Sequence, residues 1–450
     1  MLKTDRRARK YFQAYESMVL EAASPYRSRH RYDDQGSFFS SEHYMKKNFS
    51  SRYASKWKEL NDEYKWFTTE KYATVRPIGL HMGKTEIKQH VVYYLTEEGR
   101  AAAVSIVNDV ETKAQLEKRL GRKINRRNGG TLRSRDKNNN KAKRPKRQLP
   151  RAITVNLEAL QSGKAVLESI RDGSWIDCDN IQVNKLIEET LSKRNTRLTE
   201  REWALKAIVE IAFIRFVVGE DGYLAQQYEQ ATSGRWYATE GITRYTKLVR
   251  KLALFGKHEY DIENAGLAIL LQKARHNRSY PAVEDYMLNK QARRKEWAKA
   301  AGVAPELIKK GIQARIFGAG SDGDAMMAMF DGAEELSRFN RVCADLLKEV
   351  VRLNGVLYEV GEGSIGRGFT VNDLGKAMKV DGATKGSVLA HWIQGAEAHI
   401  LTEVADSEPW GQDLEVIIHD AFVFSKAVDV EGLKRYLKKK TGYSVQLERD

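Results

Sequence analysis

The stretch LEVIIHDAFVFS, residues 414–425, places a His-Asp pair between two apolar runs. Runs of this length predict two β-strands joined by a tight turn, with His419 and Asp420 at the turn. A carboxylate there can project into a cleft while the strands on either side stay buried. Turns also attract Asp for backbone reasons, so this carboxylate indicates chemistry only if a second one joins it.

A second candidate carboxylate stands in HEYDIENAGLAILLQKA, residues 258–274, where an extended segment ends at Asp261 and an apolar helix follows. Capping of that helix is the alternative role for this Asp. Two carboxylates brought together by a sheet can hold two divalent ions for in-line displacement at phosphorus. Mg²⁺ suits such oxygen ligands because it keeps several waters and shares phosphate oxygens with a substrate, and Mn²⁺ is the alternative ion.

A third element is APELIKKGIQARIFGAG, residues 304–320, which predicts a helix with Pro305 in its first turn and glycines at its end. Lys309, Gln313 and Phe317 follow one another at steps of four and therefore share one face. A cation and an aromatic ring on one face suit a nucleoside triphosphate, because the ammonium attracts phosphate and the ring packs against the sugar or base. Taken singly, each residue has an ordinary structural explanation, so only the combination indicates a nucleotide site.

In chain order, DIENAGLAIL, KKGIQARIFG, WIQGAEAHIL and IIHDAFVF resemble motif A, motif B, the glutamine helix and motif C of one polymerase superfamily. That superfamily joins DNA polymerase I to the phage and mitochondrial single-subunit RNA polymerases, and the resemblance covers about residues 225–450. It implies an α+β right-hand polymerase fold, with a palm built on a small antiparallel sheet, helical fingers and a helical thumb. An α-rich N-terminal region would precede it.

The resemblance also implies residue roles. Asp261 and Asp420 would be the catalytic, metal-binding carboxylates, and Lys309 would neutralise the incoming triphosphate and protonate the pyrophosphate. The residues expected to bind the nucleotide are Lys309, Lys310, Gln313, Phe317, Gly318 and Gly266. The residues expected to contact template or product are Gln394, His419, and Gly234 with Arg235 in TSGRWYA.

One departure from the family pattern concerns the triphosphate. The arginine normally found four residues before the fingers lysine is replaced by Pro305. Another cation must then bind the phosphates. The candidates in the sequence are Lys310, Arg315, Arg293, Arg294 and Lys295.

The position five residues after the first catalytic Asp predicts which sugar is used. The related DNA polymerases have a Glu there that blocks a ribose 2′-hydroxyl, whereas this chain has Gly266, as the related RNA polymerases do. Close helix packing is the alternative reason for this Gly. Two features argue against the use of ribonucleotides. Phe317 stands where the RNA polymerases have Tyr. Asp420 follows Asp261 by 159 positions, a spacing nearer that of DNA polymerase I.

The interpretation favoured by the sequence is therefore a minimal single-subunit DNA-directed RNA polymerase. Its partners would be a nucleic-acid template, the product strand and nucleoside triphosphates. A family A-like DNA polymerase or a primase is the alternative, and a non-catalytic nucleic-acid-binding protein is a further one. A two-metal nuclease is disfavoured, because the lysine and aromatic face would then have no role.

The 450-residue chain carries a formal net charge of +16, which favours a polyanionic partner. Residues 121–150 hold twelve Lys or Arg residues and one Asp, and their low apolar content favours a flexible arm that contacts phosphates. A solubilising linker is the alternative. The residues expected to make these contacts are Arg126, Arg127, Lys143, Arg144, Lys146 and Arg147.

Four regions are predicted along the chain. They are an α-rich N-terminal region over 1–120, the basic arm over 121–150, a helical thumb-like region over 151–225, and palm and fingers over 226–450. Two cysteines, no apolar run of membrane-spanning length and no secretory signal predict an intracellular protein without a membrane partner. If a phage encodes it, this would be the cytoplasm of an infected bacterium. The oligomeric state is left open, with a monomer as the default.

Overall fold

The structure is a computed structural model, and it describes residues 38–40, 61–65, 67–78, 84–110, 114–116, 149–150, 152–193, 198–218, 222–274, 279–330, 332–362 and 368–449. The chain forms two compact units. Unit 1 consists of residues 1–145, 151–227 and 238–256, and unit 2 of residues 146–150, 228–237 and 257–450. The six basic residues predicted to contact phosphates in the arm lie outside the described residues.

Unit 1 is built around α8 (Glu200–Val217), a helix that is buried almost continuously from Ala204 to Ile214. Its start is fixed by a capping box in which Thr199 and Glu202 satisfy each other's backbone N–H groups. The remaining helices of this unit are α4 (Glu97–Asn108), α6 (Leu157–Arg171), α7 (Ile181–Ser192), the 3₁₀ helix η1 (Ile242–Arg244) and α9 (Lys247–Ala253).

The part of unit 1 that precedes α4 contains strands. β2 (Phe67–Ile78) and β3 (Lys84–Leu95) pair antiparallel over their whole length, and β1 (Phe38–Ser40) adds to β3. Within residues 1–120 the structure therefore describes this sheet and α4, together with helical residues at 61–64 and 114–116. A second pairing joins β4 (Ala152–Thr154) to β5 (Tyr223–Ala225).

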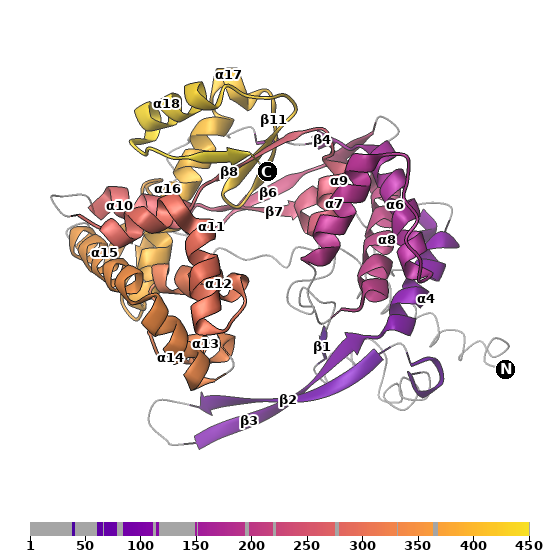
Figure 1. The fold of residues 1–450 in the computed structure, drawn as a ribbon, viewed down its shortest axis with the longest axis horizontal. Helices are drawn as coiled ribbons and strands as arrows, with labels where there is room; N and C mark the ends of the chain where they lie inside the picture. The colour runs from indigo at the N-terminus through magenta and orange to yellow at the C-terminus, as the bar shows by residue number, and fades with distance from the viewer. Residues whose placement is uncertain are drawn as a thin grey trace. The chain divides into compact units, whose positions relative to one another are not determined.

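Unit 2 contains a four-stranded antiparallel sheet in the order β11-β12-β8-β13. Two long-separated parts of the sequence meet here, because β12 lies between its hairpin partner β11 and the much earlier β8 (Figure 1). The strands are β8 (His258–Ile262), β11 (Leu414–Ile418), β12 (Ala421–Phe424) and β13 (Leu447–Arg449). All four residues of β12 are buried, as expected of a central strand.

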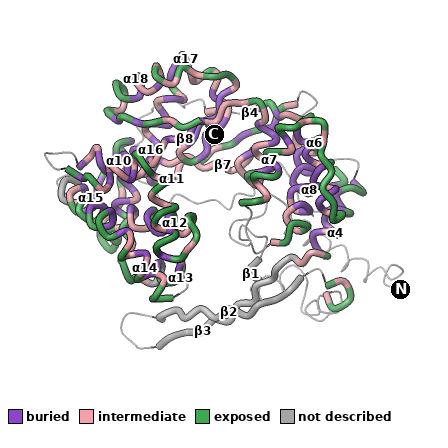
Figure 2. The backbone as a smooth tube through the Cα atoms, in the orientation of Figure 1, coloured by how far each residue is buried: buried purple, intermediate pink, exposed green. Residues whose placement is uncertain are grey.

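Helices of unit 2 cover this sheet and form a second core beside it. α16 (Lys385–Ala405) and α18 (Val430–Thr441) share one hydrophobic core with the sheet, and α16 is buried along most of its length (Figure 2). α10 and the helices after it form the other core. These helices are α10 (Ala265–Ala274), α11 (Pro281–Ala301), α12 (Pro305–Ile316), α13 (Asp324–Met329), α14 (Ala333–Val342) and α15 (Ala344–Glu362).

Shorter elements accompany these helices. β9 (Phe369–Val371) pairs with β10 (Ala377–Lys379), and α17 (Glu408–Gly411) follows α16. The β6 (Gln227–Gln230) and β7 (Trp236–Glu240) strands form a ribbon whose residues 228–237 belong to unit 2. The prediction of an α+β fold is confirmed, and a small antiparallel sheet covered by helices is the arrangement expected of a polymerase palm.

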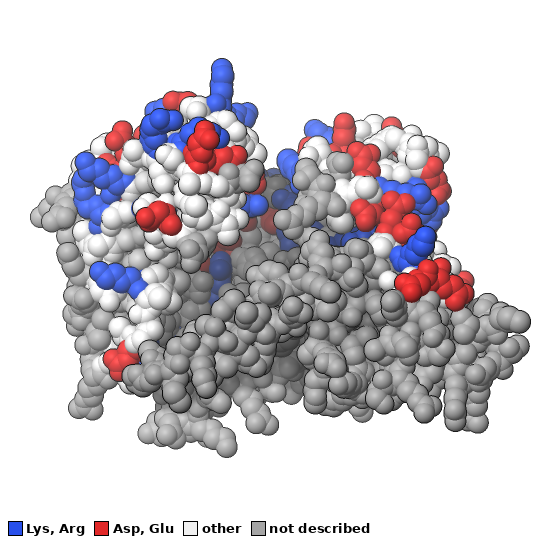
Figure 3. Space-filling model, turned by 90° about the horizontal axis from the view of Figure 1, so that it is seen from below, with Lys and Arg blue, Asp and Glu red and all other residues white. Residues whose placement is uncertain are grey.

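Two properties of the described residues bear on partners. None of their helices is both long and apolar enough to cross a membrane. On the face shown in Figure 3, basic and acidic side chains are interspersed over the described surface.

Candidate active site

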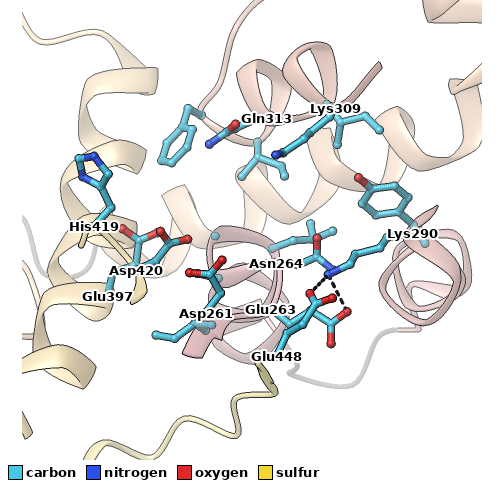
Figure 4. A pocket seen from close by; sticks show the side chains of 18 of the residues that line it. Asp261, Glu263, Asn264, Lys290, Lys309, Gln313, Glu397, His419, Asp420 and Glu448 are labelled. Carbon is cyan, nitrogen blue, oxygen red and sulfur yellow. Dashed lines mark hydrogen bonds and ion pairs between the residues drawn. The ribbon is translucent and has the colours of Figure 1, made fainter. Parts of the chain in front are cut away.

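The unit 2 sheet brings the two predicted carboxylates together. Asp261 is the register partner of Ala421, so it lies beside Asp420 at the β11–β12 turn, and the Ile262 N–H donates to the Asp420 carbonyl oxygen at 3.1 Å. Both acids line one cavity of about 590 Å³ (Figure 4). His419 lines it too and has a φ of +53°, a left-handed conformation that non-glycine residues adopt mainly where the surrounding structure imposes it.

A third acid that sequence reasoning missed lies in the same cavity. Glu397 on α16 is 3% exposed, and Figure 4 shows it next to Asp420. Burial raises the pKa of Glu397 to about 7, although the positive charge of Arg235 acts in the opposite direction. The available signal was its position three residues after Gln394, which puts both on one face of an otherwise apolar helix; Gln394 lines the cavity as well.

Arg235 reaches the cavity from the β6–β7 turn. Its Nη2 atom lies 3.2 Å from Oε2 of Glu397. Three hydrogen bonds connect the turn region to α16. The Trp236 indole donates to Thr402 Oγ1 at 3.3 Å, and Asn372 Nδ2 bridges the two by donating to the Ser233 carbonyl oxygen at 2.7 Å and to that of His391 at 3.2 Å. The arginine is thus fixed in place.

Gly234, the other residue predicted for this contact, does not line the cavity. It has a φ of +90°, and an added Cβ would lie 2.5 Å from Leu374 Cδ1. Gly234 therefore forms the turn that presents Arg235, and the structure gives it no direct place in the site.

The predicted face of α12 lines the cavity, with Lys309, Gln313 and Phe317 all in its wall. Lys309 is about half exposed and has only a loose contact with Glu306, at 3.7 Å. Lys310 points elsewhere on the helix and does not line the cavity.

Gly318, also predicted to bind nucleotide, instead ends α12. The Gly318 N–H donates to the Arg315 carbonyl oxygen, and the Ala319 N–H donates to the Ala314 carbonyl oxygen. This pair of hydrogen bonds is the pattern of a Schellman motif. Gly318 has a φ of +83°, and an added Cβ would lie 3.0 Å from Gly386 Cα. It does not line the cavity.

Gly266 lines the cavity at the start of α10. An added Cβ would lie 3.4 Å from Ile316 Cγ2 and 4.0 Å from the ring of Phe317, both ordinary contact distances. Close packing therefore does not exclude a Cβ at this position, which lies near Phe317.

Helix α11 supplies two further cations to the cavity wall, Lys290 and Arg294. Lys290 was missed by sequence reasoning, and it pairs with Glu263 at 3.0 Å and Glu448 at 2.6 Å. Of the five cations considered as replacements for the missing fingers arginine, the other four do not line the cavity: Lys310, Arg315, Arg293 and Lys295.

The donor set suits a hard divalent cation. Asp261 and Asp420 offer only oxygen atoms, and Mg²⁺ is commonly held by one or two carboxylates together with water and substrate phosphates. Among the described residues no group of three or more His, Cys, Asp or Glu side chains is placed to hold a metal ion.

Comparisons with known proteins give a weak structural likeness and nothing at the level of sequence. No protein-family model and no curated protein matches the chain. Among solved structures, the polymerase domain of Pol1 from M. smegmatis, in complex with a DNA primer-template and dNTP, is similar with a TM-score of 0.42 and 14% identity. The match covers 66% of this chain and 66% of that one, just under two thirds of its length.

Proposed function

We propose that this protein is a template-directed nucleotidyltransferase that extends a nucleic-acid strand with nucleoside triphosphates. One observation supports it above all others: two carboxylates from different strands share a cavity with the Lys309, Gln313 and Phe317 face of α12. Figure 4 shows the carboxylates on one side and Lys309 with Gln313 across from them. A nuclease would need the acids but has no use for the helix face.

In this proposal each side chain has the role that the family resemblance implies. Lys309 neutralises phosphate charge and is the group able to give a proton to departing pyrophosphate. Phe317 packs against the sugar, while His419 and Gln394 contact the strand that carries the 3′ end. Mg²⁺, when bound by Asp261 and Asp420, supplies Lewis acidity for the displacement.

We further propose that the nucleotides are ribonucleotides, which makes the protein a single-subunit RNA polymerase. Gly266 supports this choice, because it lines the cavity near Phe317 without a side chain, although an added Cβ would meet only ordinary contacts there. DNA polymerase or primase activity is the second candidate, since Phe317 has no hydroxyl with which to recognise ribose.

Primer extension separates these possibilities. The protein is incubated with a primed DNA template, Mg²⁺ and either rNTPs or dNTPs, and products are resolved by length. Extension with rNTPs is the expected result. Extension with dNTPs alone would establish the second candidate, and template binding without extension by either set would indicate a non-catalytic nucleic-acid-binding protein.

A further inference from the structure

We propose that Arg294 is the second cation that binds the triphosphate, in place of the fingers arginine that Pro305 replaces. The proposal rests on the proposed function. It concerns which residue completes the phosphate site of this chain.

Helix α11 is kinked at Asn289, and residues on both sides of the kink line the cavity. They include Tyr286, Lys290 and Arg294, which share the cavity with Lys309 of the neighbouring helix α12. The cavity that holds Asp261 and Asp420 is therefore also lined by cations from two helices. A polyphosphate extending away from the two acids would meet them.

Lys290 is not available for this purpose. Its ammonium is engaged by two carboxylates, those of Glu263 and Glu448, and its side chain is only 13% exposed. These contacts tie α11 to the end of β8 and to β13. Its charge is neutralised within the protein.

Arg294 differs, because nothing in the described part of the chain neutralises it. Its Nε donates to the Tyr286 hydroxyl at 2.7 Å, and its guanidinium lies over the Tyr286 ring at 5.5 Å from the centroid. Among the described residues no carboxylate pairs with it. Tyr286 is itself fixed, since it is 2% exposed and stacked on Trp297. The hydrogen bond from Nε thus orients the guanidinium, and its two Nη groups can donate to a phosphate.

The adjacent arginine provides a matched control. Arg293 pairs with Asp285 at 2.6 Å and Glu296 at 2.8 Å and does not line the cavity. Arg293→Ala removes the same charge from the same helix without touching the proposed site.

The test compares Arg294→Ala, Arg294→Lys and Arg293→Ala in primer extension. Arg294→Ala is expected to raise the KM for the nucleotide roughly 10- to 100-fold, with unchanged affinity for primer-template. Arg294→Lys should recover part of this loss, and Arg293→Ala should behave like the wild type. An unchanged nucleotide KM in a folded Arg294→Ala protein would overturn the proposal while the polymerase function stands.

Binding of inorganic tripolyphosphate, followed by isothermal titration calorimetry, keeps the two proposals separate. Suppose that the wild type binds tripolyphosphate but extends no primer, and that Arg294→Ala abolishes this binding while Arg293→Ala does not. The anion site would then be supported and the polymerase function would be contradicted. Absence of both binding and extension in the wild type would overturn both.

Discussion

Arg235 and Glu397 form an ion pair 3.2 Å long at the edge of the cavity, with side chains 17% and 4% exposed. One partner comes from the β6–β7 turn and the other from α16, 162 residues later. At pH 8, where Glu397 is ionised in the wild type, Arg235→Met would leave the buried carboxylate without its cation and raise the pKa of Glu397 further. We expect a loss of about 3 kcal/mol in unfolding free energy, largely restored in the Arg235→Met, Glu397→Gln double variant. Urea denaturation measures both, and additive effects of the two substitutions would argue against coupling.

The same acid should give the stability a pH dependence. The pKa of Glu397 is about 7 in the folded protein and has an ordinary value of 4.5. Between these values the folded state binds more protons than the unfolded state, so this group makes stability fall as the pH rises. The unfolding free energy of Glu397→Gln, relative to that of the wild type, should therefore increase as the pH rises from about 4.5 to about 7.

Urea denaturation across this range, in EDTA to remove divalent ions, checks the pH prediction. The exposed Glu408 offers the matched control Glu408→Gln, which should follow the wild-type curve. Parallel curves for the wild type and Glu397→Gln would mean that Glu397 titrates at its ordinary value.

Removal of either carboxylate proposed to be catalytic should abolish synthesis. Asp261→Asn and Asp420→Asn are each expected to reduce incorporation roughly a thousandfold or more, because a metal-assisted displacement depends on several kcal/mol of charge stabilisation. Glu259→Gln, on the same strand but outside the cavity, is the control. A gel-shift assay should show that both Asn variants still bind primer-template. If they still incorporated nucleotides, the two acids would have no catalytic role.

Substitution at Gly266 should change the choice of sugar. Gly266→Glu is expected to lower kcat/KM for rNTPs relative to dNTPs by roughly 100-fold, because the side chain would extend beside Phe317. Gly266→Ala, whose Cβ meets only ordinary contacts, should keep the wild-type preference. Single-nucleotide incorporation kinetics give both ratios, and equal losses for the two sugars would rule out a gate at this position.

Gly318→Ala should destabilise unit 2 more than Gly302→Ala. Both positions have positive φ, which costs an Ala about 1 kcal/mol or more. At Gly302 an added Cβ meets nothing within 4 Å, whereas at Gly318 it meets the Gly386 backbone at 3.0 Å. Chemical denaturation should give a lower unfolding free energy for Gly318→Ala than for Gly302→Ala. Equal losses would show that the Gly386 backbone moves to accommodate the added Cβ.

Local pattern was enough for the parts of the site that lie on single elements. The apolar runs around His419 and Asp420 predicted the β11–β12 hairpin, and steps of four predicted the α12 face with Lys309 and Phe317. Both follow from backbone periodicity, which depends on neighbours in sequence. The sequence by itself therefore determined the hairpin, the helix and the residue types they present.

Tertiary structure alone decided which distant residues meet. Glu397, Lys290 and Arg294 join the site because α16 and α11 pack beside the sheet, and nothing local distinguishes Arg294 from the paired Arg293. Likewise the sequence predicted glycine at the end of α12, but only the tertiary structure shows that Gly318 packs against Gly386 and lies outside the cavity lining. The physical reason is that burial and charge compensation depend on neighbours supplied by other elements, and sequence spacing does not encode those neighbours.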